Sequence, residues 1–367
     1  MQMKNWLKRL GIVAVVAVFA VCLLLAYDNR ERTTVIDHYE SNEKLVTVKP
    51  DWPGTPVDED GRFINYEHPY LPRMTDLLRW QLSRNEFKEA KQNDTERLEV
   101  KDPTEFLSSE RDGIIWLGHA SFLIRIDGVN FLIDPIFGKP PFVKRFVDVP
   151  SPLGAIRRVD YVLLSHDHRD HADETTLRAV AERFPSAVFI GGLRMDDIFN
   201  EWKTPGNEIE TAGWFQQFDV PAGVPDIYFV PVRHWARRGL FDTNHRLWGG
   251  YVIKGKTHSI YFGGDSGYGR HYADVGELFP GIDYFLIGIG AFEPRWFMHP
   301  MHNSPEDALK AFVDIGAKTL VPMHYGTFDL SDEPPGEPLR QLRQKAAEMG
   351  LTDRLKVLTI NESLDLN

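Results

Sequence analysis

Histidine and aspartate residues are concentrated directly after one strand-like apolar run, in the stretch VLLSHDHRDHAD at residues 162–173. His166 and His168 are two positions apart, so an extended chain directs both side chains to the same side, where they can bind one metal ion. Asp170 and His171 follow where the chain turns, and can bind a second ion. Imidazole nitrogens and carboxylate oxygens suit Zn²⁺, and iron and manganese are alternatives for the same donors.

Three more residues of the same types follow apolar runs elsewhere. His234 comes after IYFVPVR, Asp265 after SIYFGG, and His324 after TLVPM. Because the strands of a packed sheet bring their ends to a common edge, we expect these side chains to meet the first cluster there. Asp265 is placed between the ions, since a carboxylate offers two oxygens. The seven candidate ligands divide into His166, His168 and His234 for one ion, Asp170, His171 and His324 for the other, and Asp265 as the bridge.

The sequence from residue 111 to residue 367 predicts a layered α/β domain. Asp127 and Gly128 separate two apolar runs, which predicts a β-hairpin. Periodic apolar residues predict a helix over residues 173–184, and a second helix begins after Ser304 and stops at Gly316. Strand runs that come first and are followed by mixed strands and helices are typical of a domain with sheets inside and helices outside. Further strands are expected in DYVLLS, SAVFIGG, DIYFVPV, LWGGYVIKG, HSIYFGG, DYFLIGIGA and KTLVPM.

An uninterrupted apolar run extends from Gly11 to Tyr27, with Lys4, Lys8 and Arg9 before it. The length and the basic flank predict an uncleaved signal anchor, a single membrane-spanning helix within residues 1–30. The basic flank would stay in the cytoplasm and the rest of the chain would be exported, to the periplasmic side in a bacterium.

Residues 31–110 are polar and rich in turn-forming residues, so we expect an irregular extension that packs on the main domain. A short amphipathic helix is expected near residues 75–87. The net charge of −11 disfavours nucleic acid as a partner. Cys22 is the only cysteine, which excludes internal disulfides and a thiolate metal site. The oligomeric state is not predicted.

Several longer motifs make the chain resemble the metallo-β-lactamase superfamily, and within it the N-acylphosphatidylethanolamine-hydrolysing phospholipase D family. The resemblance runs from about Gly61 to the C-terminus, and it implies an αββα sandwich with a binuclear zinc site at one edge of the sheets. The motifs are WLGHASFLI, FLIDPIF, LLSHDHRDH, RHWARRGLFDTNHRLWGGYVI, FGGDSGYG, GAFEPRWFM and MHYGTFDLSDEP.

Three further polar residues are candidates around the metals. His119 in LGHAS and Asp134 in LIDP are expected to contact and orient metal ligands. His302 aligns with a site histidine of the resembled family and is expected to contact the substrate phosphate. Asp170, Asp265 and His302 are therefore the candidate catalytic residues.

The resemblance implies a zinc-dependent phosphodiesterase that acts on a membrane phospholipid. In such an enzyme two ions would lower the pKa of a water that attacks the phosphodiester of an N-acylphosphatidylethanolamine, and the products would be phosphatidic acid and an N-acylethanolamine. A lactonase or a sugar-phosphate hydrolase of the same superfamily is the first alternative. A membrane-tethered metal-binding protein without catalysis is the second, and retention of all seven ligand-type residues argues against it.

Overall fold

The computed structural model divides into two compact units, which are described separately. One consists of residues 1–35 and 71–84, and its described part contains helix α2 (Met74–Leu82), in which no residue is buried. The other consists of residues 36–70 and 85–367. The described residues are 35–65, 67–68, 73–141, 143–148 and 152–366.

The expected membrane anchor at residues 1–30 lies outside the described residues. Within the described ranges, no helix is both long enough and apolar enough to cross a bilayer. The anchor, and the exported location that depends on it, therefore stay predictions.

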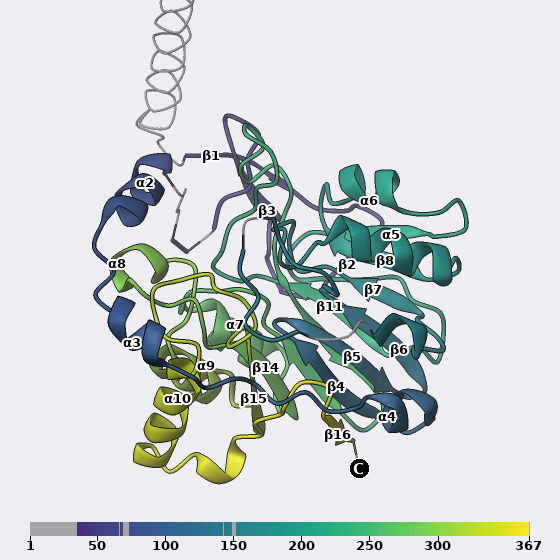
Figure 1. The fold of residues 1–367 in the computed structure, drawn as a ribbon. Helices are drawn as coiled ribbons and strands as arrows, with labels where there is room; N and C mark the ends of the chain where they lie inside the picture. The colour runs from purple at the N-terminus through teal and green to yellow at the C-terminus, as the bar shows by residue number, and fades with distance from the viewer. Residues whose placement is uncertain (1–34, 66, 69–72, 142, 149–151, 367) are drawn as a thin grey trace, which may run out of the picture. The chain divides into compact units, whose positions relative to one another are not determined.

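Two seven-stranded mixed sheets form the framework of the larger unit (Figure 1). In the first sheet the spatial order is β16 (Ser363–Asp365), β4 (Gly113–Gly118), β5 (Ser121–Ile126), β6 (Val129–Ile133), β7 (Tyr161–Leu163), β8 (Val188–Gly192) and β9 (Ile209–Ala212). In the second it is β15 (Thr319–Met323), β14 (Tyr284–Gly288), β13 (Ser259–Phe262), β12 (Gly250–Lys254), β11 (Asp226–Val230), β10 (Gln216–Gln217) and β2 (Val46–Thr47).

Each sheet combines an antiparallel part with a parallel part. β6 to β9 are parallel to one another in the first sheet, and β13 to β15 are parallel in the second. Most of these strands are buried over nearly their whole length, as expected for sheets covered on both faces. The expected αββα sandwich is confirmed.

Helices cover the outer faces of both sheets, and one hydrophobic core fills the space between the sheets. In Figure 1, α5 and α6 lie on the side of the first sheet and α9 and α10 on the side of the second. The helices of this unit are α3 (Lys88–Asn93), α4 (Thr104–Ser108), α5 (Glu174–Arg183), α6 (Asp196–Trp202), α7 (His271–Leu278), α8 (Arg295–Met298), α9 (Pro305–Ile315) and α10 (Glu337–Glu348), with 3₁₀ turns η1 (Pro152–Gly154) and η2 (Thr352–Arg354).

The local signals in the sequence correspond to local geometry. Asp127 and Gly128 both have positive φ, of 52° and 75°, and they join β5 to β6 as the hairpin prediction requires. Ser304 and Asp307 form a reciprocal capping box before α9, and Gly316 ends that helix at φ 68°. The expected helix and strand positions are confirmed at these places.

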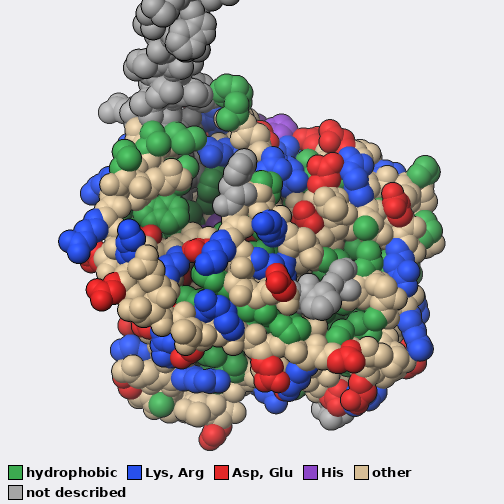
Figure 2. Space-filling model, in the orientation of Figure 1, with side chains coloured by type: hydrophobic (Ala, Val, Ile, Leu, Met, Phe, Trp, Pro, Cys, Tyr) green, Lys and Arg blue, Asp and Glu red, His purple; other side chains and the backbone are tan. Residues whose placement is uncertain are grey.

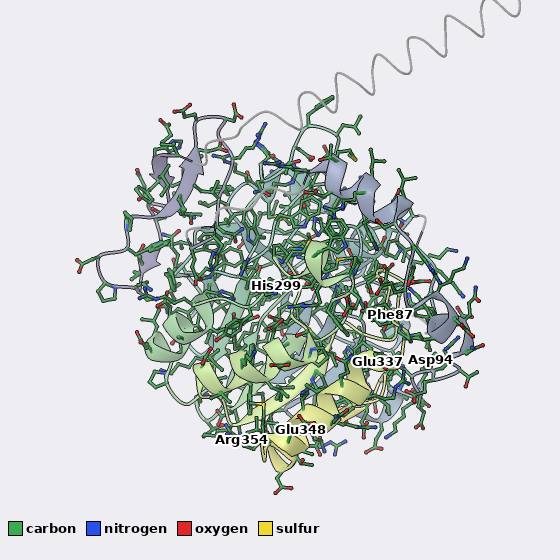
Figure 3. All side chains as sticks on the ribbon, turned by 90° about the vertical axis from the view of Figure 1, so that its left-hand side faces the viewer. Phe87, Asp94, His299, Glu337, Glu348 and Arg354 are labelled. Atoms are coloured by element: carbon green, nitrogen blue, oxygen red, sulfur yellow. The ribbon has the colours of Figure 1, made fainter. Side chains whose placement is uncertain are left out.

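The segment before residue 111 is more regular than its composition suggested. β1 (Ile36–Glu40) and β3 (Thr55–Asp58) form a small two-stranded sheet, and β2 extends the second large sheet through β10. Asp94 accepts hydrogen bonds from the backbone of Gly336 and from Arg340 at the start of α10, and Figure 3 shows Asp94 near Glu337. Contacts with distant residues give this segment its structure.

Candidate metal centre

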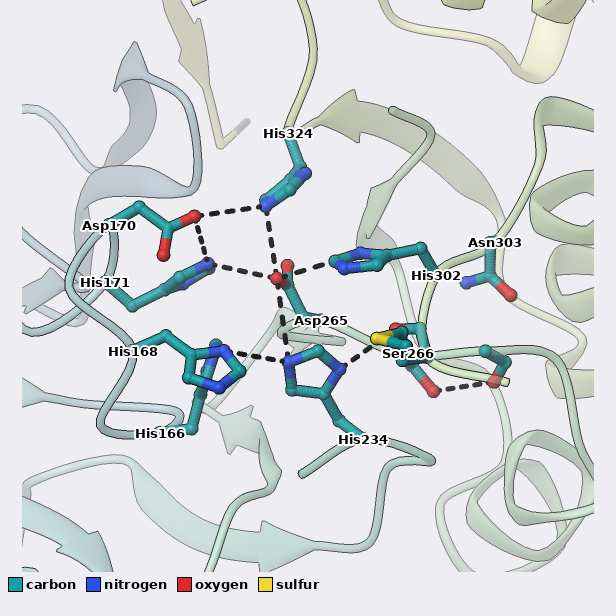
Figure 4. A network of polar contacts seen from close by, with 12 residues as sticks. His166, His168, Asp170, His171, His234, Asp265, Ser266, His302, Asn303 and His324 are labelled. Carbon is teal, nitrogen blue, oxygen red and sulfur yellow. Dashed lines mark hydrogen bonds and ion pairs between the residues drawn. The ribbon is translucent and has the colours of Figure 1, made fainter. Parts of the chain in front are cut away.

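Strand ends bring all seven candidate ligands to one place. The loop after β7 carries His166 to His171, while His234 lies four residues after β11. Asp265 follows β13 and His324 follows β15 directly, so four strands of two sheets contribute. Figure 4 shows these side chains pointing toward one another.

Three imidazoles, here called the imidazole group, converge in one half of the centre: His166, His168 and His234. Nε2 of His166 and Nε2 of His234 lie 3.0 Å and 3.2 Å from Nδ1 of His168. Nδ1 of His234 donates to the carbonyl of Met301 at 2.9 Å. Nε2 of His234 is therefore unprotonated, and its lone pair faces the imidazole group.

The tautomer of His166 is fixed in the same way. The Ser165 hydroxyl donates to Asp134 at 2.6 Å, so it accepts from Nδ1 of His166, 2.9 Å away. Nε2 of His166 is therefore also unprotonated and carries a lone pair. Nitrogen lone pairs directed at one point, without a proton between them, form a site for a metal ion.

Asp170, His171 and His324 form the other half, here called the carboxylate group. One oxygen of Asp170, Oδ2, lies 3.7 Å from Nε2 of His171 and 3.8 Å from Nε2 of His324. Nδ1 of His171 contacts Asp134 at 2.8 Å, which directs Nε2 of the same ring into the centre. Three donors from two loops thus surround a second position that could hold an ion.

Asp265 lies between the two groups, at the centre of the network in Figure 4. Its Oδ2 is 3.2 Å from Nε2 of His171 and 3.1 Å from Nε2 of His324. The same oxygen is 3.9 Å from Nε2 of His234, which belongs to the imidazole group. This position suits the bridging role predicted for Asp265.

His119 and Asp134 lie where they can orient ligands. Both follow strands in the left-handed region, with φ of 55° and 41°, which turns the chain sharply toward the centre. Nε2 of His119 is 3.0 Å from Oδ2 of Asp170. Asp134 is fully buried and accepts from the Ser165 backbone at 2.7 Å, in addition to the contacts above. His119 therefore supports the carboxylate group, whereas Asp134 supports both groups.

The pKa values differ between the two groups. Burial lowers the pKa of His234 to about 3 and that of His168 to about 4, and it holds the pKa of His166 well below its ordinary value. Burial also disfavours charge on His324, but Asp265 and Asp170 outweigh it and raise its pKa to about 9. The pKa of His171 is raised in the same way, against its burial, first by Asp265.

Several buried atoms in this centre have no hydrogen-bond partner, although such atoms are costly inside a protein. They are Nε2 of His171, Oδ1 of Asp265, both ring nitrogens of His324, and Nε2 of His168. Both nitrogen and oxygen donors are present, and Nε2 of His171 and Nε2 of His324 lie 3.2 Å and 3.1 Å from Oδ2 of Asp265, between the two groups. The donor set fits bound metal, which would satisfy these two nitrogens at once.

His302 lies at the edge of the same space. Its Nδ1 is 3.8 Å from Oδ2 of Asp265, and its ring lies 5.2 Å from the ring of His234. The ring of Trp235 packs edge-on against the ring of His168, with centroids 4.4 Å apart. Trp296, by contrast, is 45% exposed on α8, so it does not lie in the core.

A buried ionic network behind the ligand loop was not found from the sequence. Asp167 is fully buried between two ligand histidines, and Arg246 donates to it at 2.8 Å and also pairs with Asp242. Ser165 and the carbonyl of Met301 were missed as well. The only signal in the sequence was a further aspartate inside the histidine motif, which alone does not identify a partner.

The protein-family comparison matches the model described as a beta-lactamase superfamily domain to residues 129–325, which contain every one of the seven ligand candidates. The chain belongs to the β-lactamase superfamily. Its relatives include proteins from Methanopyrus kandleri and Hyperthermus butylicus that are named as metal-dependent hydrolases.

Two relatives illustrate the similarity. An uncharacterised protein of Mycobacterium tuberculosis is 34% identical over 243 residues, covering 64% of both chains. An N-acyl-phosphatidylethanolamine-hydrolysing phospholipase D of Caenorhabditis elegans is 31% identical over 231 residues, covering 59% of this chain and 64% of the relative. The match thus spans about 64% of the length of these relatives.

A solved structure agrees with the fold. A metallo hydrolase from the archaeon Ignicoccus hospitalis superposes with a TM-score of 0.53 at 22% identity, covering 70% of this chain and 98% of the other. At this identity the likeness supports the fold, and the chemistry has to be argued from the residues.

Proposed function

We propose that the protein is a phospholipase of the D type, which hydrolyses N-acylphosphatidylethanolamine-like lipids with the help of two zinc ions. The observation that carries the proposal is the pair of ligand groups joined by Asp265, with His302 at their edge. The similarity to the phospholipase D of Caenorhabditis elegans supports this substrate class.

The reaction adds water to the phosphorus and breaks the bond between phosphorus and the ethanolamine oxygen. The water oxygen stays on phosphatidic acid, and a proton goes to the released N-acylethanolamine. A metal pair supplies Lewis acidity toward the phosphate and lowers the pKa of water. The imidazole group would hold one ion and the carboxylate group the other, with Asp265 between them.

The residues around the metal positions orient the ligand rings and can donate a hydrogen bond to the substrate phosphate. Asp134 and the Met301 carbonyl hold ligand rings so that their lone pairs face the centre. His302 can donate an imidazole N–H to a phosphate oxygen, because its ring is directed toward Asp265 from a different loop than the ligands. Trp235 provides an apolar wall beside His168.

Product analysis in ¹⁸O-labelled water tests the proposal. The purified protein, loaded with zinc, is incubated with N-acylphosphatidylethanolamine in mixed micelles, and Asp265→Asn protein is the matched control. We expect unlabelled N-acylethanolamine and phosphatidic acid that carries one ¹⁸O. Hydrolysis of lactones or sugar phosphates without lipid turnover would favour the alternative hydrolases. No turnover of any of these by the zinc-loaded protein would favour a non-catalytic metal-binding protein.

Metal content forms a separate part of the proposal. Seven ligand candidates, three in each group and Asp265 between the groups, lead us to expect about two metal ions per chain after dialysis. We expect zinc to be the metal that restores activity to the stripped protein. Elemental analysis that finds one ion or none would contradict the binuclear centre. If only iron or manganese restored activity to the stripped protein, that metal and not zinc would be the cofactor.

We also propose that residues 1–30 anchor the chain in a membrane with the catalytic domain outside the cytoplasm, on the basis of the apolar run and its basic flank. Reporter fusions after residue 40 should be active outside the cytoplasm. Activity of the same fusions only inside the cytoplasm would reverse the orientation.

A further inference from the structure

A loop beside the metal centre exposes two neighbouring apolar side chains. Leu240 is 73% exposed and Phe241 is 68% exposed, the highest values among the large apolar side chains in the described part of the larger unit. Single exposed apolar residues are ordinary, but adjacent ones on a projecting loop are typical of interaction sites. Residues 239–241 are here called the apolar tip.

The loop is held firmly at its base, so the exposure is not a consequence of a loose segment. Asp242 accepts from the backbone of Gly239 at 2.7 Å, which fixes the turn that carries the apolar tip. Arg246 joins Asp242 to the fully buried Asp167. Arg238 donates to the carbonyls of Asp167 and Ala172. The loop is therefore fastened to the metal-ligand loop.

The apolar tip lies close in sequence and in space to the metal ligands. Its loop begins at His234, and the next ring, Trp235, packs on His168. Arg237 lies over the Trp235 ring at 5.4 Å, and the exposed Arg169 donates to the carbonyl of Arg238 at 3.3 Å. Arg237 in this loop and Arg169 in the neighbouring ligand loop thus place two cationic side chains beside the segment that joins the tip to the centre.

Apolar side chains next to arginines are the composition of a surface that binds phospholipid headgroups. Leucine and phenylalanine can enter the boundary between headgroups and acyl chains, while arginine pairs with phosphates. The net charge of −11 repels anionic lipids, but salt screens such repulsion beyond about 8–10 Å. Whether the protein binds a bilayer therefore depends on the contacts that the apolar tip makes. Figure 2 shows acidic and basic side chains interspersed over the face in view.

We propose that the apolar tip inserts into the surface of a phospholipid bilayer and holds the metal centre against the lipid that it hydrolyses. The proposal rests on the proposed function, since a bilayer lipid as substrate is what makes this placement useful. It assigns to this loop a docking role that is separate from catalysis, because neither Leu240 nor Phe241 belongs to the ligand set.

A fluorophore in the tip tests the contact directly. Phe241→Cys in a Cys22→Ser background is labelled with an environment-sensitive dye, and the full chain is reconstituted in vesicles of phosphatidylcholine and phosphatidylglycerol. We expect a blue shift and quenching by nitroxide-labelled lipids. Met349→Cys, at another exposed apolar position, is the matched control and should report water. A dye at position 241 that reports water would overturn the proposal.

Turnover separates docking from catalysis. In Leu240→Ser/Phe241→Ser protein we expect at least about tenfold slower hydrolysis of N-acylphosphatidylethanolamine in vesicles, because the apolar contact with the bilayer is lost. Hydrolysis of a soluble short-chain analogue should stay within about twofold. Equal losses on both substrates, or no loss on vesicles, would overturn docking. A wild-type chain that hydrolyses neither substrate while its tip dye enters the bilayer would reject the proposed function and keep the docking.

Discussion

The two halves of the metal centre use similar side chains in different electrostatic surroundings. The imidazole group consists of two buried rings and the half-buried ring of His168, and the pKa values of all three are lowered. In the carboxylate group, Asp170 and the adjacent Asp265 raise the pKa values of His171 and His324 instead. The first group therefore offers a dication neutral lone pairs, whereas the second offers it negative charge.

The difference teaches that the two ion positions are supported separately and share a few residues. Asp265 reaches both groups through one oxygen, and Asp134 reaches His171 directly and His166 through Ser165. The side chain of His119 forms a hydrogen bond with Asp170, and its carbonyl accepts from the backbone of His324, so both contacts are with the carboxylate group. Substitution of shared residues should damage both halves, and substitution of the others should damage one.

The largest effect is expected for Asp265→Asn. The amide keeps one oxygen but loses the charge that offsets two dications, so turnover should fall by about 10²–10³ fold and metal should be lost from both groups. Rates and metal content measure this. Asp353→Asn, an exposed carboxylate, is the control and should stay within a few fold. Near wild-type turnover of the variant with both metals bound would contradict the bridging role predicted for Asp265.

His302→Gln should slow catalysis without weakening metal binding by the imidazole group or the carboxylate group. The ring lies beside Asp265 but belongs to neither set of ligands, so we expect a fall in turnover of about 10² fold with the full metal content retained. Elemental analysis alongside kinetics distinguishes the roles. Loss of one metal equivalent would instead place His302 among the ligands.

Asp134→Asn should weaken metal binding in both halves. The amide cannot accept from Ser165 and His171 as the carboxylate does, so ring orientation is lost on both sides. We expect up to about 100-fold weaker binding, the upper range for a residue behind the ligands. Competition with a chelator measures both equivalents. Selective weakening of one equivalent would show that Asp134 is not shared.

The smallest effect is expected for His119→Gln, which should act on the carboxylate group alone. Its contact with Asp170 orients one ligand, so we expect about tenfold weaker binding of one metal equivalent and an unchanged second equivalent. The same chelator competition resolves the two. Weakening of both equivalents would contradict the separation of the halves.

Residues that act through local pattern could be predicted from the sequence. The hairpin at Asp127 and Gly128 and the cap at Ser304 depend on a few neighbouring residues, so their signals are complete in the sequence. The ligand candidates could be found for a related reason. Each comes shortly after an apolar strand, and packed sheets bring such ends together.

Residues that act across the chain could not be predicted in this way. β2 joins a sheet through β10, which follows it by about 170 residues, and nothing in two residues specifies that partner. The orientation of His234 depends on the Met301 carbonyl, 67 positions later. Such contacts decide which ring nitrogen can bind a metal. When one nitrogen of a histidine ring donates its proton to a partner, the other nitrogen carries the lone pair.

The sequence by itself therefore determined where most strands lie along the chain, the types of ligand and the family to which the chain belongs. Only the tertiary structure decided which partners hold and orient the ligands, and that Leu240 and Phe241 remain exposed beside the centre. The physical reason is that residue type and spacing are local properties, whereas burial, charge surroundings and hydrogen-bond partners arise when distant segments pack together.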